Sequence, residues 1–394
     1  MSDLKIFTDN IEDKARAQID ELMNQEVFKD AKVRIMPDVH AGKGCVIGFT
    51  ADLGDKVVPN LVGVDIGCGM LTVNLQLHYT DINLSNLDEE IRRLVPSGRN
   101  VHENQNTIYA EMLRELYCYD HLKNWDHLLK SVGTLGGGNH FIEIDVDKVG
   151  NSYLIIHSGS RNLGKQVAEY YQELAVKSSV GRDKLSVERL IAEYKATGRE
   201  KEIAGALEAL KTSSPIIPKH LAYLEGEYRK QYLHDMEICQ KFAHYNRLDI
   251  ASNIIGMDVG YYKHFTTIHN YIDFESNIVR KGAISARAGE TVLIPLNMRD
   301  GCILGVGKGN PDWNYSAPHG AGRLMSRAEA KRTVSMEDFK NSMSGIYTTS
   351  VVESTIDESP FAYKAPEEII ERISDTVEIL EVLKPIYNFK ATEV

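Results

Sequence analysis

Short motifs that carry Asp, Cys or His are spread from residue 65 to residue 319, most of them beside glycine. They are GVDIGCGM with Asp65 and Cys68, GGGNHF with His140, IIHSGSR with His157, TIHNYI with His269 and SAPHGAGR with His319. A thiolate, a carboxylate and several imidazoles are the donors of a metal site, and the small residues leave room for a phosphate. Because a domain boundary between the motifs would divide such a site, we expect one large domain.

The length of the chain does not by itself predict a single domain. At 394 residues it exceeds the roughly 250–300 at which single cores usually stop growing. No Pro/Ser-rich linker or low-complexity stretch divides it, however. We therefore predict one domain over residues 1–394, with an insertion.

Periodicity separates glycine-rich β regions from one helical block. Residues 13–24, 86–95 and 105–129 have helical patterns, whereas VRIMPDVHAGKGCVIGFTADL, LVGVDIGCGMLTVNLQL, FIEIDVD, YLIIHSG and residues 268–307 read as strands and glycine turns. Residues 163–246 shift to Glu, Lys, Leu, Ala and Tyr, which predicts several helices broken near Gly181, Gly198 and Pro215–Pro218. The motifs fall in the β regions, so we assign the helical block, about 163–250, to scaffolding or substrate contact.

The C-terminal region has an apolar stripe at helical spacing. It runs from Pro366 through Ile369, Ile370, Ile373, Val377 and Leu380. Proline favours the first turn of a helix, so a final helix is predicted there.

Composition restricts the functional classes. A net charge of −11 argues against a nonspecific nucleic-acid coat, although a local basic groove remains compatible with it. The N-terminus lacks the apolar region of a signal peptide, and no apolar run approaches the roughly 20 residues of a membrane span. The five cysteines are scattered without a close pair. We expect no disulfides, no membrane contact and a cytoplasmic location.

Each motif also has an ordinary structural explanation. Cys68 can be a small buried apolar residue, and His157 and His269 can be core histidines. Asn139 can cap a turn, although the glycine loop before it could also hold a phosphate. Arg323, Arg327 and Lys331 are four residues apart and would lie on one helix face, either solvated or facing an anionic substrate.

Three further observations favour anion and metal chemistry. Arg161 follows His157 at the expected start of a helix, which is a natural anion site. PDVHAGKG, with Asp38, His40 and Lys43, could supply phosphate contacts or hydrogen bonds to site residues. By donor preference Zn²⁺ comes first, with Mn²⁺, Fe²⁺ or Co²⁺ behind it, and a shared thiolate and carboxylate could hold two ions.

Taken together, the motifs resemble those of the RtcB family of RNA-splicing ligases. The resemblance rests on PDVHAGKG, GVDIGCGM, GTLGGGNHFIEI, HSGSR, HNY, RKGAISARAG and HGAGR in this order, and it runs from about Pro37 to the C-terminus. It implies an α+β fold, with mixed β-sheets around a central metal and nucleotide site and with the helical block as an insertion. Family members use GTP and Mn²⁺ to join an RNA 3′-phosphate or 2′,3′-cyclic phosphate to a 5′-hydroxyl.

The resemblance also implies roles for individual residues. His319 would be the nucleophile that takes GMP from GTP. The other implied roles are two Mn²⁺ ions on Asp65, Cys68, His140, His157 and His269 with Cys68 shared, a phosphate contact from Asn139, nucleotide contacts from Glu143 and Lys390, and substrate phosphates near Arg161, Arg323 and His40.

The implied partners are RNA ends in repair or tRNA splicing and an archease-type activator, and the chain is expected to be a monomer. Two departures from the family pattern leave GTP or ATP open and suggest a divergent repair branch. Ala317 and Pro318 replace the usual cysteine-containing turn before the nucleophile, and Lys390 is followed by Ala-Thr-Glu-Val instead of glycine alone. The alternatives are a metal-dependent phosphoesterase that opens cyclic phosphates without ligating, and a protein that binds RNA ends or nucleotides without turnover.

Overall fold

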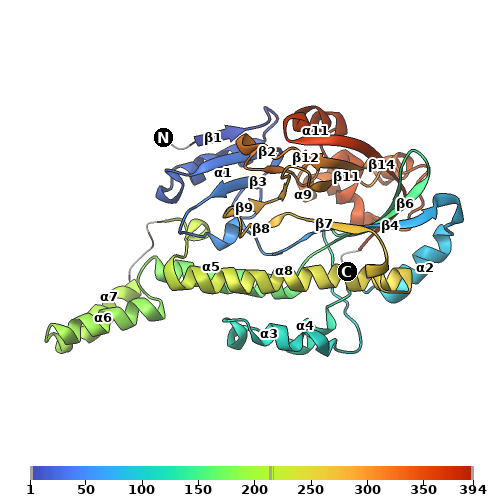
Figure 1. Cartoon of the computed structure of the whole chain (residues 1–394). Coiled ribbons are helices and arrows are strands. Elements are labelled where there is room, and N and C mark those ends of the chain that lie inside the picture. The colour runs from blue at the N-terminus through green and yellow to red at the C-terminus, as the bar shows by residue number, and fades with distance from the viewer. Residues whose placement is uncertain (1–2, 213–214, 216, 392–394) are drawn as a thin grey trace.

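Two large β-sheets form the centre of the molecule. The computed structural model describes residues 3–212, 215 and 217–391 (Figure 1). The five-stranded sheet has the order β1 (Asp3–Ile6), β2 (Lys32–His40), β3 (Ile47–Asp52), β9 (Ile278–Lys281) and β8 (Asn270–Ile272). The seven-stranded sheet has the order β11 (Thr291–Asn297), β12 (Gly301–Gly307), β14 (Val377–Lys390), β5 (Phe141–Val146), β6 (Asn151–Ser158), β4 (Gly69–His78) and β7 (His264–Ile268). A small antiparallel pair joins β10 (Ala283–Ser285) to β13 (Ser316–Pro318).

Helices cover the sheets unevenly. The short ones are α1 (Asp13–Met23), α2 (Leu84–Leu94), α3 (Ala110–Arg114), α4 (Trp125–Lys130), α9 (Arg327–Thr333), α10 (Met336–Ser342) and α11 (Pro366–Arg372). The block after β6 consists of α5 (Arg161–Ser178), α6 (Lys184–Ala196), α7 (Ile203–Thr212) and α8 (Gly226–Ile255). In Figure 1, α5 and α8 run side by side beneath the sheets, whereas α6 and α7 project away from them.

The fold confirms the predicted α+β class. The five-stranded sheet is mixed, since β1 pairs with β2 in parallel, and the strand pairs of the seven-stranded sheet are antiparallel. The largest apolar cluster lies among the five-stranded sheet, α1, α5 and α8, and a second packs the seven-stranded sheet on α2 and α8. Within the described residues, no helix is both long and apolar enough to cross a membrane. That residues 163–250 are an insertion stays a prediction.

Several predicted elements are confirmed. The helices at 13–24 and 86–95 form as α1 and α2, and FIEIDVD and YLIIHSG form as β5 and β6. The helical block breaks near Gly181 and Gly198, whose backbones have φ of +69° at both positions, a conformation that favours glycine. Of Pro215–Pro218, residue 216 lies outside the described part.

Three element predictions are wrong. The expected strand before Cys68 is a loop, because Gly63 and Gly67 adopt φ of +94° and +71° and the strand begins only at Gly69. The helix at 105–129 is divided into α3 and α4, with Asn124 left-handed at φ +57° between them. The final helix ends at Arg372, because residues 377–390 pair with β12 and β5 as a long strand.

Candidate active site around Cys68 and His319

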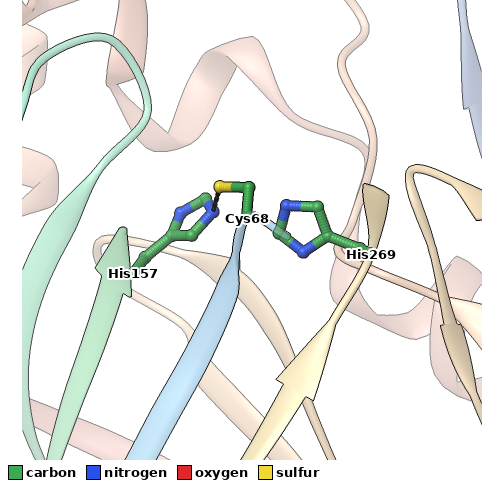
Figure 2. A group of neighbouring side chains, drawn as sticks. All are labelled: Cys68, His157 and His269. Atoms are coloured by element: carbon green, nitrogen blue, oxygen red, sulfur yellow. Dashed lines mark hydrogen bonds between the residues drawn. The ribbon is translucent and has the colours of Figure 1, made fainter. Parts of the chain in front are cut away.

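Three adjacent strands of the seven-stranded sheet bring Cys68, His157 and His269 together. Cys68 directly precedes β4, His157 lies near the end of β6, and His269 follows β7. Because β4 lies between β6 and β7 and runs antiparallel to both, the start of β4 meets the ends of β6 and β7, and the three residues lie close together there. Figure 2 shows the Cys68 thiol between the two imidazoles.

The distances define two groups of donors that share Cys68. Its Sγ lies 3.2 Å from Nε2 of His157 and 3.4 Å from Nε2 of His140. The Oδ2 atom of Asp65 lies 3.0 Å from the same Nε2 of His140. Cys68 forms one group with His157 and His269 and another with Asp65 and His140, and in each group the donor atoms lie within 4.8 Å of one another. The structure thus brings together all five predicted metal ligands.

The donor set fits a metal site. The Nδ1 atoms of His140 and His157 lie 2.8 Å and 3.1 Å from the backbone oxygens of Leu135 and Asn139. A carbonyl only accepts, so each Nδ1 carries a hydrogen, and Nε2 of each ring is the atom that faces Cys68 and would face a cation. In the described part of the chain, the buried Nδ1 of His269 has no hydrogen-bond partner. A soft thiolate, a hard carboxylate and imidazoles suit a divalent transition metal.

Burial and neighbouring charge set the protonation of these donors. Burial, then the neighbouring imidazoles, lower the pKa of His157 and of His269 well below the usual value, so both rings are neutral. Burial alone would raise the pKa of Asp65, but the hydrogen bonds with His140 and Cys68 and the neighbouring positive charges together outweigh it and lower the pKa to about 2. Burial and the charge of Asp65 raise the pKa of the Cys68 thiol. A bound cation would therefore displace a proton from Cys68.

Two buried side chains of α8 hold the loops of this donor set, and the sequence analysis missed both. The guanidinium of Arg247 donates to the backbone oxygens of Gly67, at 2.9 Å, and Ser158, at 2.8 Å. The amide of Asn246 donates to Ser158 Oγ and accepts from the N–H of Thr134. In the sequence, the one sign of these two residues is that a polar pair occupies core-facing positions of a helix. Their hydrogen bonds show that the helical block also positions the site.

Glycine is required where the backbone crosses Asp65. The N–H of Ser160 donates to Oδ1 of Asp65 at 3.1 Å, so the start of α5 contacts this carboxylate. A Cβ atom on Gly159 would lie 2.1 Å from that same oxygen. At the helix start where an anion site was predicted, a backbone N–H therefore already binds the carboxylate of Asp65.

His319 lies beside the donor set and is held by Asp38. The ring Nδ1 and the backbone N–H of His319 lie 2.7 Å and 3.1 Å from Oδ2 of Asp38. The ring centroids of His269 and His319 are 4.8 Å apart. Because the carboxylate accepts the Nδ1 hydrogen, Nε2 of His319 keeps a free lone pair. Asp38 therefore makes hydrogen bonds to a site residue, which is the second of the two roles considered for the PDVHAGKG motif.

Ala317 and Pro318 do not remove His319 from the site. They lie in the short strand β13, where Pro318 is opposite Ala283 of β10. Proline and the residue before it favour extended backbone, which suits this strand. The ring of His40 also lies near that of His319, with centroids 6.5 Å apart, and burial lowers the pKa of His40 to about 4.

A cavity of about 860 Å³ opens beside these residues. Its lining includes predicted site residues, namely His40, Asp65, Cys68, Asn139, Glu143, His157, His269, His319, Arg323 and Lys390. Phe141 and Tyr363 add aromatic walls. Metal donors, a candidate nucleophile and cationic side chains thus share one space large enough for a nucleotide.

An acidic centre holds the cations at one side of the cavity. Glu358 contacts Lys390 at 3.0 Å, Arg327 at 3.1 Å and Arg323 at 3.3 Å and accepts a hydrogen bond from Tyr363. Burial would raise the pKa of Glu358, but these cations lower it to about 2. The sequence analysis did not find Glu358, since an acidic residue in DESP carries no distinctive pattern.

The basic residues of SAPHGAGRLMSRAEAKR are arranged differently from the prediction. Of the three residues predicted to share a helix face, Arg327 and Lys331 belong to α9, whereas Arg323 precedes it, because the helix begins at Arg327. Arg327 and Lys331 both contact buried Asp357, at 3.0 Å and 3.4 Å. They are therefore ion-paired to the protein rather than forming a purely solvated face.

Arg161 and Asn139 both adjoin the glycine loop at residues 133–138. The Arg161 guanidinium donates to Thr134 Oγ1 and to the Gly98 carbonyl, both at 3.2 Å, and packs against Gly136. The Asn139 side chain is exposed at the cavity. Their proposed phosphate contacts stay predictions, as do the nucleotide contacts of Glu143 and Lys390.

Comparison with known proteins identifies the family to which the chain belongs. A family model described as tRNA-splicing ligase RtcB matches residues 18–127 and 120–391. The RNA-splicing ligase RtcB of Escherichia coli (strain K12) is 32% identical, over 92% of this chain and 90% of its own length. The tRNA-splicing ligase RtcB of Archaeoglobus fulgidus is 28% identical, over 86% and 82%. An RNA-splicing ligase RtcB homolog of Entamoeba dispar is 26% identical, over 90% and 78%. The chain therefore belongs to the RtcB family.

Proposed function

We propose that this protein is an RNA ligase that joins a 3′-phosphate or 2′,3′-cyclic phosphate end to a 5′-hydroxyl end, with GTP as the activating nucleotide and His319 as the nucleophile. The observation that carries this proposal is the position of His319. Its ring is 4.8 Å from that of His269 in the donor set, and its Nδ1 is bound to Asp38 at 2.7 Å. Names of the matched relatives support RNA as the substrate.

The first step is attack of His319 Nε2 on the α-phosphorus of GTP. A P–N bond forms, the bond to the β-phosphate oxygen breaks, and pyrophosphate leaves. Asp38 keeps the proton on Nδ1 and stabilises the positive charge that develops on the ring. This side chain also holds the His319 backbone, so the attacking nitrogen stays directed away from Asp38.

In the next steps, the RNA 3′-phosphate displaces His319 and forms a diphosphate with GMP. The 5′-hydroxyl then attacks the RNA phosphorus, a phosphodiester forms, and GMP leaves with the bridging oxygen. A cyclic phosphate is first opened by water to a 3′-phosphate. Arg323, Arg327 and Lys390 line the cavity and would supply positive charge for phosphoryl oxygens.

Two Mn²⁺ ions are proposed for the donor set, held by Asp65, Cys68, His140, His157 and His269. When bound, they would neutralise phosphoryl charge and help activate water or a hydroxyl. Since Cys68 belongs to both donor groups, it would help to hold either ion. An archease-type activator, a monomeric state and a cytoplasmic location remain parts of this proposal that rest on the family resemblance and on composition.

The test is covalent labelling with α-³²P GTP in the presence of Mn²⁺. Wild-type protein should gain acid-labile label, and His319→Ala should gain none. His264→Ala is the matched control, because His264 is an exposed histidine of β7 and should leave labelling intact. Absence of label in wild type, together with opening of a cyclic phosphate, would replace the ligase with the phosphoesterase alternative. Absence of both, with RNA ends still bound, would leave the binding protein.

A further inference from the structure

Two carboxyl side chains lie next to each other below the cavity. Glu143 and Asp145 are two residues apart on β5, so they face the same side of the sheet. Both are buried, with 3% and 0% exposed surface. With the Cys302 sulfur, their oxygens form a group whose atoms lie within 4.8 Å of one another. Only Glu143 reaches the cavity wall.

This pair has a surplus of hydrogen-bond acceptors. Within the described chain, no N–H or O–H group donates to either oxygen of Asp145 or to Oδ1 of buried Asn388, and the weakly donating thiol of Cys302 is the group beside Asp145. Asn388 donates one hydrogen bond to Oε1 of Glu143, and the Cys302 thiol lies 4.0 Å from Oε2. Acceptors without donors are costly to bury, and two neighbouring carboxylates are costlier still.

The neighbouring cations do not neutralise both carboxyls. On the adjacent strand β14, Lys390 is paired with Glu358 at 3.0 Å, and Lys384 is exposed at the surface. On the other side, β6 presents Tyr153 opposite Asp145. On β12 the titratable group is Cys302, whose thiol pKa is raised by burial and then by the charge of Asp145. A proton is the remaining way to satisfy the pair.

The titration behaviour of the two groups agrees with this geometry. Burial, and then the charge of Asp145, raise the pKa of Glu143 well above its usual value, although Lys390 opposes the shift. Burial likewise raises the pKa of Asp145. One of the two carboxyls therefore keeps a proton well above the pH at which an exposed one would lose it.

The protonation state of Glu143 determines which purine base its carboxyl group can bind. A neutral carboxyl offers one O–H donor and one acceptor, which complements the N1 acceptor and N6 amino group of adenine. A carboxylate offers two acceptors, which complement the N1–H and N2 amino group of guanine. The aromatic side chains of Phe141 and Tyr363 line the same cavity and can pack on a purine.

We infer that Glu143 and Asp145 share one proton, and that this proton decides which purine nucleotide the cavity accepts. With the proton on Glu143 the site favours ATP, and with Glu143 ionised it favours GTP. Binding of GTP thus releases a proton from the pair, so the preference for GTP over ATP rises with pH. This inference rests on the proposed function, which places a purine nucleotide in the cavity beside His319.

The test is the affinity of the Mn²⁺-loaded protein for the α,β-methylene analogues of GTP and ATP, which cannot transfer their nucleotide to His319. Calorimetric titrations from mildly acidic to mildly alkaline pH give the affinity ratio. In wild type the ratio should rise with pH, by up to about tenfold per pH unit when one proton is released. Asp145→Asn should give a higher GTP-to-ATP affinity ratio than wild type at every pH at which the wild-type ratio is still rising, because Glu143 then ionises without a neighbouring carboxyl group.

Two further variants define the pair. Glu143→Gln fixes one donor and one acceptor, so its ratio should be low and independent of pH. Asp147→Asn makes the same charge change just beyond β5 and should behave as wild type. The infrared band of a neutral carboxyl should be present in wild type without nucleotide and should diminish in Asp145→Asn, which reports the proton independently of binding.

The outcomes separate this inference from the proposed function. A ratio that is flat with pH and unchanged in Asp145→Asn would overturn the inference while leaving nucleotide binding intact. Absence of the neutral carboxyl band at neutral pH would also overturn it. If neither analogue bound at any pH, the result would contradict the proposed nucleotide-dependent function itself, and the inference about purine choice would be contradicted with it.

Discussion

Asp38 binds His319 twice through one oxygen, at 3.1 Å from the backbone N–H and at 2.7 Å from ring Nδ1. The same carboxylate therefore fixes both the position of the residue and the tautomer of its ring. Gly322 makes this approach possible, because a Cβ atom there would lie 2.3 Å from the Asp38 carbonyl. Orientation of the nucleophile thus depends on a segment almost 300 residues earlier in the chain.

Asp38→Asn should strongly reduce covalent labelling by GTP. The amide cannot stabilise a positively charged ring, and its NH₂ group favours the wrong tautomer, so the rate of labelling should fall by about 100-fold or more. Rapid-quench measurement of the labelled protein gives this rate. Metal content should stay at the wild-type value, since Asp38 is outside the donor set. A labelling rate within a few-fold of wild type would contradict the role of Asp38.

Removal of Cys68 should cost more bound metal than removal of His269. Cys68 is common to both donor groups, whereas His269 belongs to one. Cys68→Ala should therefore weaken binding of two Mn²⁺ ions, and His269→Ala of one. Equilibrium dialysis with the free ion measured by electron paramagnetic resonance gives the stoichiometry. Cys118→Ala, at a buried cysteine outside the donor set, is the control. Equal losses in the Cys68 and His269 variants would argue against a shared thiolate.

The sequence predicted the donor set better than the framework around it. Cys68, His140 and His157 stand in glycine-flanked motifs that favoured a shared metal site, and the resemblance to the family then implied the full ligand set. Arg247 and Glu358 carry no such signal, since their roles depend on which backbone oxygens and cations the fold places near them.

Long-range pairing also explains the main error in secondary structure. The stretch VEILEVL fits a helical stripe and an extended strand almost equally well. This stretch forms a strand because it pairs with its neighbours in the sheet, and β12 and β5 flank β14 there. The cavity residue Lys390 lies at the end of this strand, so local periodicity could not place it.

Gly159→Ala should damage the metal site without unfolding the protein. Its Cβ would lie 2.1 Å from Oδ1 of Asp65, so the carboxylate must move away from His140. Mn²⁺ affinity should fall by about tenfold or more. Gly205→Ala is the matched control, because Gly205 is in α7 and a Cβ there meets no atom within 4 Å. That change should preserve metal binding and raise stability by up to about 1 kcal/mol. Equal metal affinity in both variants would contradict the contact at Asp65.

Glu358 should make the stability of the protein depend on pH in the acidic range. Its pKa is about 2 in the folded chain, against a usual value of 4.5, so the ionised form is favoured by folding. A lowered pKa contributes stability that is present above the unfolded value and is lost as the pH falls through the folded one. The contribution is on the order of 3 kcal/mol at neutral pH, from the size of the shift.

Glu358→Gln should therefore be destabilised at neutral pH, and the difference from wild type should shrink as the pH falls from about 4.5 toward 2. Urea unfolding at a series of pH values gives the free energy of unfolding of each protein. Glu103→Gln, at an exposed position, should follow the wild-type curve. A difference between Glu358→Gln and wild type that stayed constant over this range would show that the ion pairs with Lys390, Arg323 and Arg327 do not hold Glu358 ionised.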